Sequence, residues 1–124
     1  MKVLHTKDAP QPIGPYSQGI EIDGLIFLSG QIGLKPETGE MADNLAQQTH
    51  QVMKNVSTML NSAGCSFGDV VKSTIYLKDI TCFAEFNKIY SEYFTENPPA
   101  RTTIEVSALP RNALIEIDII AHKS

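Results

Sequence analysis

The longest helical pattern in this chain is the segment NLAQQTHQVMKNVSTMLNSA, residues 44–63. Apolar or small side chains recur along it with the spacing of one helix face, at Leu45, Thr49, Val52, Val56, Met59, Leu60 and Ala63. This spacing predicts a helix with one buried side, and Gly64 is placed to serve as its C-cap. Because such a helix must lay its apolar face on another layer, the segments around it decide the fold class.

The segments after this helix predict a strand, a second helix and two more strands. Val70–Leu77 has the alternation of a strand. Thr81 can cap a second helix, in which aromatic side chains form a stripe. The members of this stripe are Phe83, Phe86, Tyr90, Tyr93 and Phe94. Two prolines, Pro98 and Pro99, stop the helix, and the last two strands are predicted at residues 102–107 and 114–122.

The segments before the first helix predict a hairpin preceded by a short strand at residues 3–6. Residues 17–23 alternate, whereas residues 25–30 (LIFLSG) are nearly all apolar, which is typical of a strand covered on both faces. Asp23-Gly24 between them is a tight-turn signal. The whole order predicts a single α+β domain over residues 1–124, with two helices on one face of a mixed sheet of five or six strands.

The second face of this sheet has no predicted cover. Apolar side chains of the last two strands are expected on both faces: Ile104, Val106, Ile115, Ile117 and Ile119. Two helices cannot cover both faces of a sheet of this width. We therefore expect other copies of the chain to bury the free face, in a closed ring.

Composition is that of a compact, acidic protein. Of 124 residues, 42% are hydrophobic and 19% charged, which is unlike a disordered chain. A net charge of -4 and a pI of about 5.2 disfavour binding to nucleic acid or to an anionic membrane. The first residues lack the apolar stretch of a secretion signal, so a cytoplasmic location is expected. The cysteines and histidines show no metal-ligand spacing, and we expect neither a metal nor an organic cofactor.

The segment PPARTTIEV, residues 98–106, puts an arginine at the start of a strand. The two prolines force an extended entry, and the β-branched residues that follow favour a strand. At this position Arg101 can hold a carboxylate or phosphate in two parallel hydrogen bonds, although most arginines are solvated surface residues. Thr103 is expected on the opposite side of the strand from Thr102 and Ile104, and it can also be an ordinary strand threonine.

Other positions can line a ligand site, and each also has an ordinary structural interpretation. Tyr16 projects from a rigid Gly-Pro turn, or it packs over the sheet edge with a solvated hydroxyl. Ser29 and Gly30 offer backbone that a ligand can approach closely, or they form a simple exit from a strand. Asn87 lies among aromatic residues, where its amide must find a partner, most often a nearby backbone group.

Glu116 stands between two isoleucines in a predicted strand, and burying an unpaired carboxylate there is costly. The alternative is an outward-facing acid with Asp118 on the same face, and Glu105 is a similar case that the pattern does not separate. No Ser-His or Cys-His pair and no glycine-rich phosphate loop is visible. The candidates are an arginine, a tyrosine, an amide, a carboxylate and exposed backbone, which suit the binding of a small carboxylate and one water molecule.

Taken together, these segments resemble the Rid/YjgF family of reactive-imine deaminases. The matching stretches are residues 9–10, 13–19, 29–32, 64–72, 83–87, 99–101, 106, 109–110 and 115–118. They keep their order over nearly the whole chain, which makes the resemblance more specific than any single motif. It implies a trimer of chorismate-mutase-like subunits with clefts between neighbours.

The resemblance also implies a reaction and a role for each residue. Relatives with arginine at this position hydrolyse 2-iminopropanoate and 2-iminobutanoate, released by pyridoxal-phosphate-dependent dehydratases, to 2-oxo acids and ammonia. By this resemblance Arg101 binds the substrate carboxylate, Glu116 holds or activates the attacking water, and Tyr16, Ser29, Gly30 and Asn87 line the cleft. Many relatives have cysteine where this chain has Thr103, which argues against an essential thiol and leaves the backbone N–H of Thr103 to serve.

Two other functions stay open from the sequence. A binding protein that senses a small carboxylate, such as 2-oxobutanoate, uses the same arginine clamp. Family members have also been described as translation inhibitors with ribonuclease activity, and as accessory proteins to a purine regulator. RNA cleavage fits an acidic chain poorly, because it calls for a basic surface.

Overall fold

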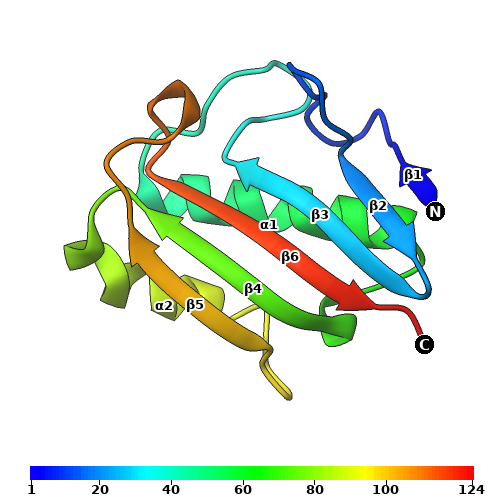
Figure 1. The fold of residues 1–124 in the computed structure, drawn as a ribbon. Coiled ribbons are helices and arrows are strands. Elements are labelled where there is room, and N and C mark those ends of the chain that lie inside the picture. The colour runs from blue at the N-terminus through cyan, green and yellow to red at the C-terminus, as the bar shows by residue number, and fades with distance from the viewer.

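In the computed structural model, which describes residues 1–124, six strands form one mixed sheet and two helices pack against it (Figure 1). The strands are β1 (Lys2–Leu4), β2 (Gly19–Ile22), β3 (Leu25–Ile32), β4 (Val70–Leu77), β5 (Ala100–Glu105) and β6 (Ile115–His122). The helices are α1 (Leu45–Ser62) and α2 (Phe83–Tyr90), with 3-10 turns η1 (Phe67–Asp69), η2 (Ile80–Cys82) and η3 (Pro110–Asn112). The strand order is β1-β2-β3-β6-β4-β5, and only β4 and β5 run parallel.

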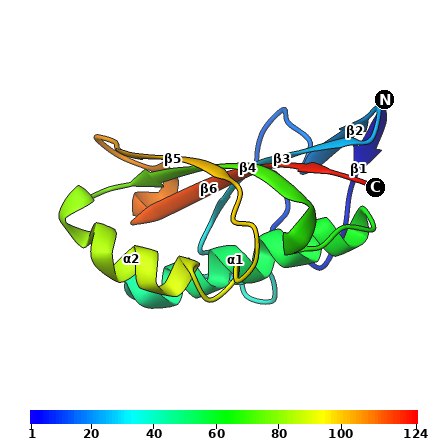
Figure 2. The same ribbon diagram turned by 90° about the horizontal axis from the view of Figure 1, so that it is seen from below.

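Figure 2 shows both helices on the same side of the sheet, as the sequence predicted. The core lies between these two layers. Ile26, Ile75 and Ile117 contribute to it from the three central strands, and Val56 and Met59 from α1; all five are fully buried. Alternation along the strands and helical spacing along α1 therefore meet in one apolar layer. The side of the sheet that carries no helix is called the open face below.

Local sequence signals fix the ends of several elements. The Asn44 side chain accepts a hydrogen bond from the Gln47 backbone N–H at 2.8 Å, which caps the start of α1. Gly64 follows the end of α1 with a positive φ of 79°, as a C-terminal glycine does. Asp23 and Gly24 have φ of 51° and 81°, so the predicted tight turn joins β2 to β3.

Helix α2 differs from the prediction at both ends. Thr81 is not its cap, because its backbone N–H and its hydroxyl both donate to the Asp79 carboxylate, and Cys82 is the residue before the helix. The helix ends at Tyr90, so the last two aromatic residues of the predicted stripe lie beyond it. Phe94 nevertheless packs on Tyr90, with ring centres 4.7 Å apart, and so the cluster survives without helical backbone.

The apolar side chains named for the last two strands do lie on both faces of the sheet, as predicted, but they are divided by strand: Ile104 of β5 is on the open face, whereas the three isoleucines named on β6 are on the helix face. Ile115, Ile117 and Ile119 all point to the core, because alternate residues of a strand share a face. Strand β3 is likewise covered on one face only. Its Phe27 side chain is 40% exposed on the open face, an exposed fraction similar to the 42% of Ile104 on β5. The open face is thus partly apolar, although less so than the sequence suggested. Neither helix is long and apolar enough to cross a membrane.

The cap of α1 provides a first test of this description. We expect Asn44→Ala to lower the free energy of unfolding by about 1 kcal/mol, because an N–H of the first turn loses its partner. Urea unfolding followed by circular dichroism measures this change. Asn61→Ala in the last turn is the control, since that exposed side chain makes no hydrogen bond in the chain. Equal losses in the two variants would contradict the capping role.

Candidate functional site

Arg101 is the second residue of β5, and its side chain lies against α2. Its Nη1 donates to the Asn87 Oδ1 at 2.8 Å. The guanidinium carbon lies 5.4, 5.7 and 5.0 Å from the ring centres of Phe83, Phe86 and Tyr90, within the range of cation–π attraction. The other guanidinium N–H groups have no hydrogen-bond partner in the chain. Arg101 is therefore a held, half-buried cation with donors left for an anionic ligand.

A buried pair of hydroxyls supports this cation. Ser73 lies beside Arg101 in the β4–β5 register, and its Oγ and the Tyr90 Oη are 2.6 Å apart. Both residues are buried, and burial is the main reason that the pKa of Tyr90 is raised. The Tyr90 hydroxyl therefore keeps its proton, and its ring is held against the Arg101 guanidinium. The sequence identified Tyr90 only as a member of an aromatic stripe, since its link to Ser73 joins separate elements.

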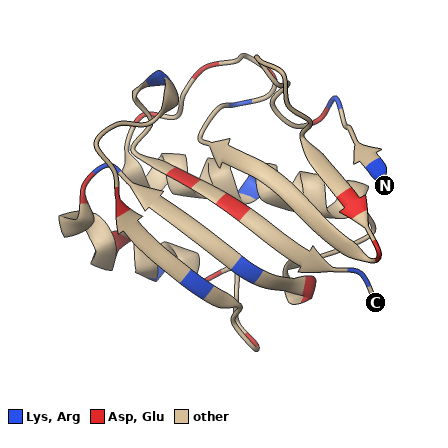
Figure 3. Cartoon of the chain, in the orientation of Figure 1, with Lys and Arg blue, Asp and Glu red and all other residues tan.

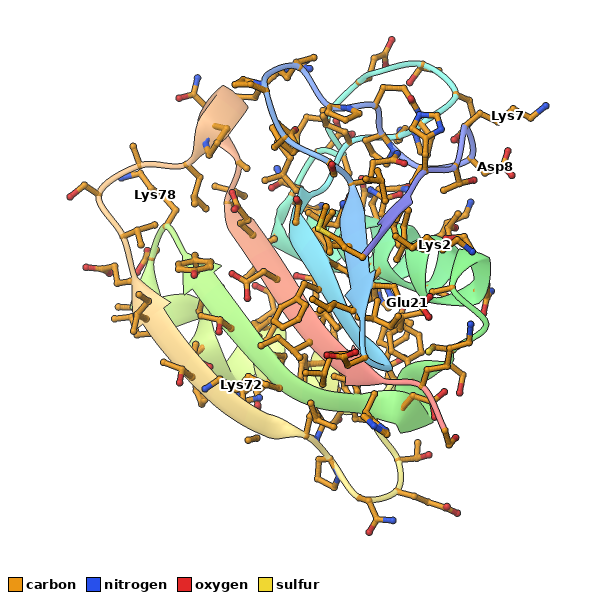
Figure 4. The ribbon with its side chains drawn as sticks, turned by 45° about the vertical axis from the view of Figure 1, so that its right-hand side comes forward. Lys2, Lys7, Asp8, Glu21, Lys72 and Lys78 are labelled. Carbon is orange, nitrogen blue, oxygen red and sulfur yellow. The ribbon has the colours of Figure 1, made fainter.

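Thr103 is on the same side of β5 as Arg101, whereas Thr102 is on the open face, as alternation predicted. The Thr103 hydroxyl oxygen is buried and has no hydrogen-bond partner. In contrast, the Thr102 hydroxyl accepts a hydrogen bond from the Nζ of Lys72 at 2.8 Å; Lys72 is labelled in Figure 4. An unpaired buried hydroxyl in a folded chain is unusual and carries a cost.

A second group of predicted residues lines a cavity of about 760 Å³ at one end of the sheet. Tyr16, Ser29, Gly30 and Glu116 all contribute to its wall. The register between β3 and β6 shifts between Leu28 and Gln31, so Ser29 and Gly30 leave the regular ladder there. Ser29 is instead tied to the preceding loop: its Oγ donates to the Ser17 carbonyl at 2.6 Å. The backbone that the sequence identified as approachable does face a cavity.

Gly30 and Glu116 are in direct contact across this cavity wall. A Cβ added to Gly30 would lie 2.9 Å from the Cδ of Glu116, closer than real Cβ atoms approach, and 3.1 Å from its Cγ, which is tighter than most real contacts. The absence of a side chain at Gly30 is therefore what lets the Glu116 carboxyl lie over the strand.

Glu116 is half-buried on the open face, with Asp118 on the same side of β6. Burial, and then the negative charge of Asp118, raise the pKa of Glu116 above its ordinary value. Asp118 in turn accepts a hydrogen bond from Tyr76 Oη at 3.0 Å, and this bond is the main reason that the pKa of Tyr76 is raised. A carboxyl group that binds its proton more tightly than usual is suited to acid–base work. Glu105, which the sequence did not separate from it, is an exposed residue that accepts from the Ile80 N–H.

Some residues of the cavity were missed from the sequence. Gln18 is 2% exposed and clamps the loop over the cavity: its amide donates to the carbonyls of Thr6 and Pro10, and its Oε1 accepts from the Thr6 N–H. Lys35 and Arg111 also line the cavity. No periodicity announces them, because they lie in connections that only the fold brings together.

The predicted residues form two groups on opposite faces of the sheet, and one chain does not bring them together. Arg101 packs against α2 on the helix face, whereas Glu116 is on the open face with Gly30. Glu116 pairs with Tyr76 on β4, and Tyr76 pairs with Ile104 on β5, so two strand spacings also separate β6 from β5. A small ligand that touches one group cannot touch the other in the same chain.

The chain is similar to known proteins over nearly its whole length. A family model described as Endoribonuclease L-PSP matches residues 6–123. The chain belongs to the Rid/YjgF family. A RutC family protein of Pyrococcus abyssi is 50% identical over 123 residues, which cover 98% of this chain and 97% of that protein. The chloroplastic Reactive Intermediate Deaminase A of Arabidopsis thaliana is 47% identical over 121 residues, 97% of this chain and 65% of the relative.

The fold is also shared with a solved structure of this family. The crystal structure of the YjgF gene product from E. coli has a TM-score of 0.96, with 40% identity and 100% of both chains covered. Family membership and the deaminase among the relatives together support a deaminase activity of the general Rid type.

The raised pKa of Glu116 in this Rid/YjgF protein predicts a pH-dependent stability. At a pH above 4.5, the ordinary pKa of a glutamate, Glu116 still holds its proton in the folded chain but has released it in the unfolded chain. The free energy of unfolding therefore falls as the pH rises toward the raised pKa of Glu116. We expect Glu116→Gln to gain free energy of unfolding relative to the wild type across this window. Urea titrations at several pH values measure the difference. Glu85→Gln, an exposed change on α2, controls for net charge, and a difference that does not vary with pH would overturn the assignment.

The unpaired hydroxyl of Thr103 predicts a stabilising substitution. We expect Thr103→Val to raise the free energy of unfolding by about 1 kcal/mol, because it removes a buried polar atom without a partner and keeps the side-chain shape. Thr102→Val is the matched control on the same strand, since it loses the hydrogen bond from Lys72 and should not stabilise. Denaturant unfolding measures the stability of both variants. A clear loss of stability in Thr103→Val would contradict the interpretation that the unpaired Thr103 hydroxyl destabilises the fold.

Proposed function

We propose that this protein is a cytoplasmic enzyme that hydrolyses 2-iminopropanoate and 2-iminobutanoate to the corresponding 2-oxo acids and ammonia. The observation that carries the proposal is Arg101, which is held by Asn87 and three aromatic rings while other guanidinium N–H groups stay free. This is the arrangement that a small carboxylate needs, because a fixed planar fork loses little entropy on binding. The deaminase among the relatives supports the same reaction class.

The site is completed by a second copy of the chain. Arg101 and Glu116 lie on opposite faces, so a substrate that contacts both must lie between two subunits. The open face offers an apolar surface for such contact, with Phe27 and Ile104 exposed. A closed ring of three subunits, which the family resemblance implies, then forms clefts with the Arg101 group from one chain and the cavity group from the next.

In this cleft Arg101 binds the carboxylate and orients the protonated imine. Tyr16, Ser29 and Gly30 line the opposite wall, and the Thr103 N–H adds a donor beside Arg101. A water molecule attacks the imine carbon; the π electrons of the C=N bond move to nitrogen, and Glu116 takes the proton of the water. Glu116 then returns this proton to the nitrogen and becomes a carboxylate again. As the C–N bond breaks and ammonia leaves, Glu116 takes the proton of the remaining hydroxyl, so that the carbonyl of the 2-oxo acid forms, and this proton passes to the ammonia as ammonium. The raised pKa of Glu116 favours the step in which it holds the proton.

Removal of the clamp tests the proposal directly. We expect Arg101→Ala to fold normally and to lose all measurable acceleration of ammonia release from an imine generated by a dehydratase. Circular dichroism checks folding, and Lys54→Ala, which removes a positive charge from α1 outside the cavity, is the control. A variant that still accelerates release contradicts the role of Arg101. Wild-type protein that binds 2-oxobutanoate without any turnover would instead favour a carboxylate sensor.

Mixed oligomers test the shared cleft. Arg101→Ala and Glu116→Gln chains should each be inactive alone, but a mixed ring contains a cleft that takes Arg101 from one chain and Glu116 from the other. We therefore expect activity to return when the two variants are unfolded together and refolded as a mixture. A mixture of Glu116→Gln with Gly30→Ala is the control and should stay inactive, because both changes damage the same group. No recovery in the first mixture means that the site lies within one chain.

A further inference from the structure

Two basic side chains of the cavity have no task in the reaction described above. Lys35, in the loop after β3, and Arg111, in η3, both contribute to the wall that also carries Glu116. Cavities of several hundred Å³ hold drug-sized ligands, so the roughly 760 Å³ cavity of the single chain is larger than a four-carbon imino acid needs. The unused space and the unused cations lie in the same cavity.

These two cations belong to one connected piece of structure. The Nη2 of Arg111 donates to the Gly39 carbonyl at 3.3 Å, and the Gly39 N–H donates to the Lys35 carbonyl at 2.8 Å. The turn that carries Lys35 is thus tied to the side chain of Arg111. Arg111 and Asn112 also have positive φ of 58° and 56°, a conformation that non-glycine residues rarely adopt in succession. The strained backbone therefore lies at a residue that lines the cavity.

Neither cation is neutralised within the chain. The ion pair of the structure joins Lys123 to Glu21 at 3.8 Å and involves neither Lys35 nor Arg111; Glu21 is labelled in Figure 4. Figure 3 shows the acidic residues of β6 in the middle of the open face. In a chain with net charge -4, these two cations outnumber Glu116, the one acidic residue that lines the cavity, and so create a local preference for an anion. The planar fork of Arg111 suits a carboxylate in particular.

We propose that the cavity accepts 2-imino acids with a second carboxylate, the imines of dicarboxylic amino acids, and that Arg111 and Lys35 bind this distal carboxylate. The proposal rests on the proposed function and names a substrate class for the same site. Arg101 of the neighbouring subunit holds the carboxylate next to the imine, and the carbon chain extends through the cavity to the two cations. The chemistry at the imine carbon is unchanged: water adds, the C–N bond breaks and ammonia leaves.

The experiment compares two imines made in the assay by amino-acid oxidases, 2-iminopropanoate from alanine and 2-iminoglutarate from glutamate. Semicarbazide competes with the enzyme for each imine, so the decrease in semicarbazone gives the relative kcat/KM. We expect Arg111→Met and Lys35→Met each to lower the ratio of kcat/KM for 2-iminoglutarate to that for 2-iminopropanoate about tenfold, the loss of one charge-assisted contact. Arg111→Lys keeps the charge and should recover part of the ratio.

Lys54→Met is the matched control, because it removes one positive charge from α1, outside this cavity. An unchanged ratio in both cavity variants, or an equal fall in Lys54→Met, overturns the proposal. Lys35→Met answers the question independently if Arg111→Met fails to fold. Calorimetry measures the binding of 2-oxoglutarate and 2-oxobutanoate to the wild type and to Lys35→Met. This measurement tests the distal carboxylate site separately from the deaminase function. If neither imine is hydrolysed while Lys35→Met weakens 2-oxoglutarate alone, the deaminase function fails and the distal site stands.

Discussion

The two-residue repeat of β6 is the constraint on which both the core and the candidate site depend. Ile115, Ile117 and Ile119 are buried against the helices, and this leaves Glu116 and Asp118 on the open face. A shift of the strand by one residue would exchange these sets, burying two carboxylates in the apolar layer at a cost that no packing gain offsets. The same hydrophobic pattern that stabilises the fold therefore fixes which face carries the acid.

The edge of the sheet imposes a corresponding constraint on Arg101. Strand β5 pairs only with β4, and its helix face meets α2, where aromatic rings and Asn87 surround the guanidinium. Tyr90 connects this surface to the core through its hydrogen bond with the buried Ser73. The cation and the acid are each well supported, but by different layers. A site that uses both is therefore a property of an assembly, and this is why our proposed reaction lies between subunits.

Much of the fold could be predicted because its signals are local. The turn at Asp23-Gly24, the glycine at position 64 that ends α1 and the alternation of Val70–Leu77 each depend on a few neighbouring residues, and all three are confirmed. Errors arose where a local signal had a competitor. Thr81 looks like a helix cap in sequence, but the adjacent carboxylate of Asp79 takes its hydroxyl. The aromatic stripe continued past the end of α2 because packing on Tyr90 does not require helical backbone.

The sequence by itself determined the secondary structure, the fold class and the residue types available for chemistry, because short-range periodicity and turn preferences act over a few residues. Only the tertiary structure decided which of these residues share a surface. It assigned Arg101 and Glu116 to opposite faces, and it gathered Lys35, Arg111 and the Gln18 clamp around one cavity. These groupings depend on strand order, register and loop closure across many residues, and no local pattern in a linear sequence encodes such distances.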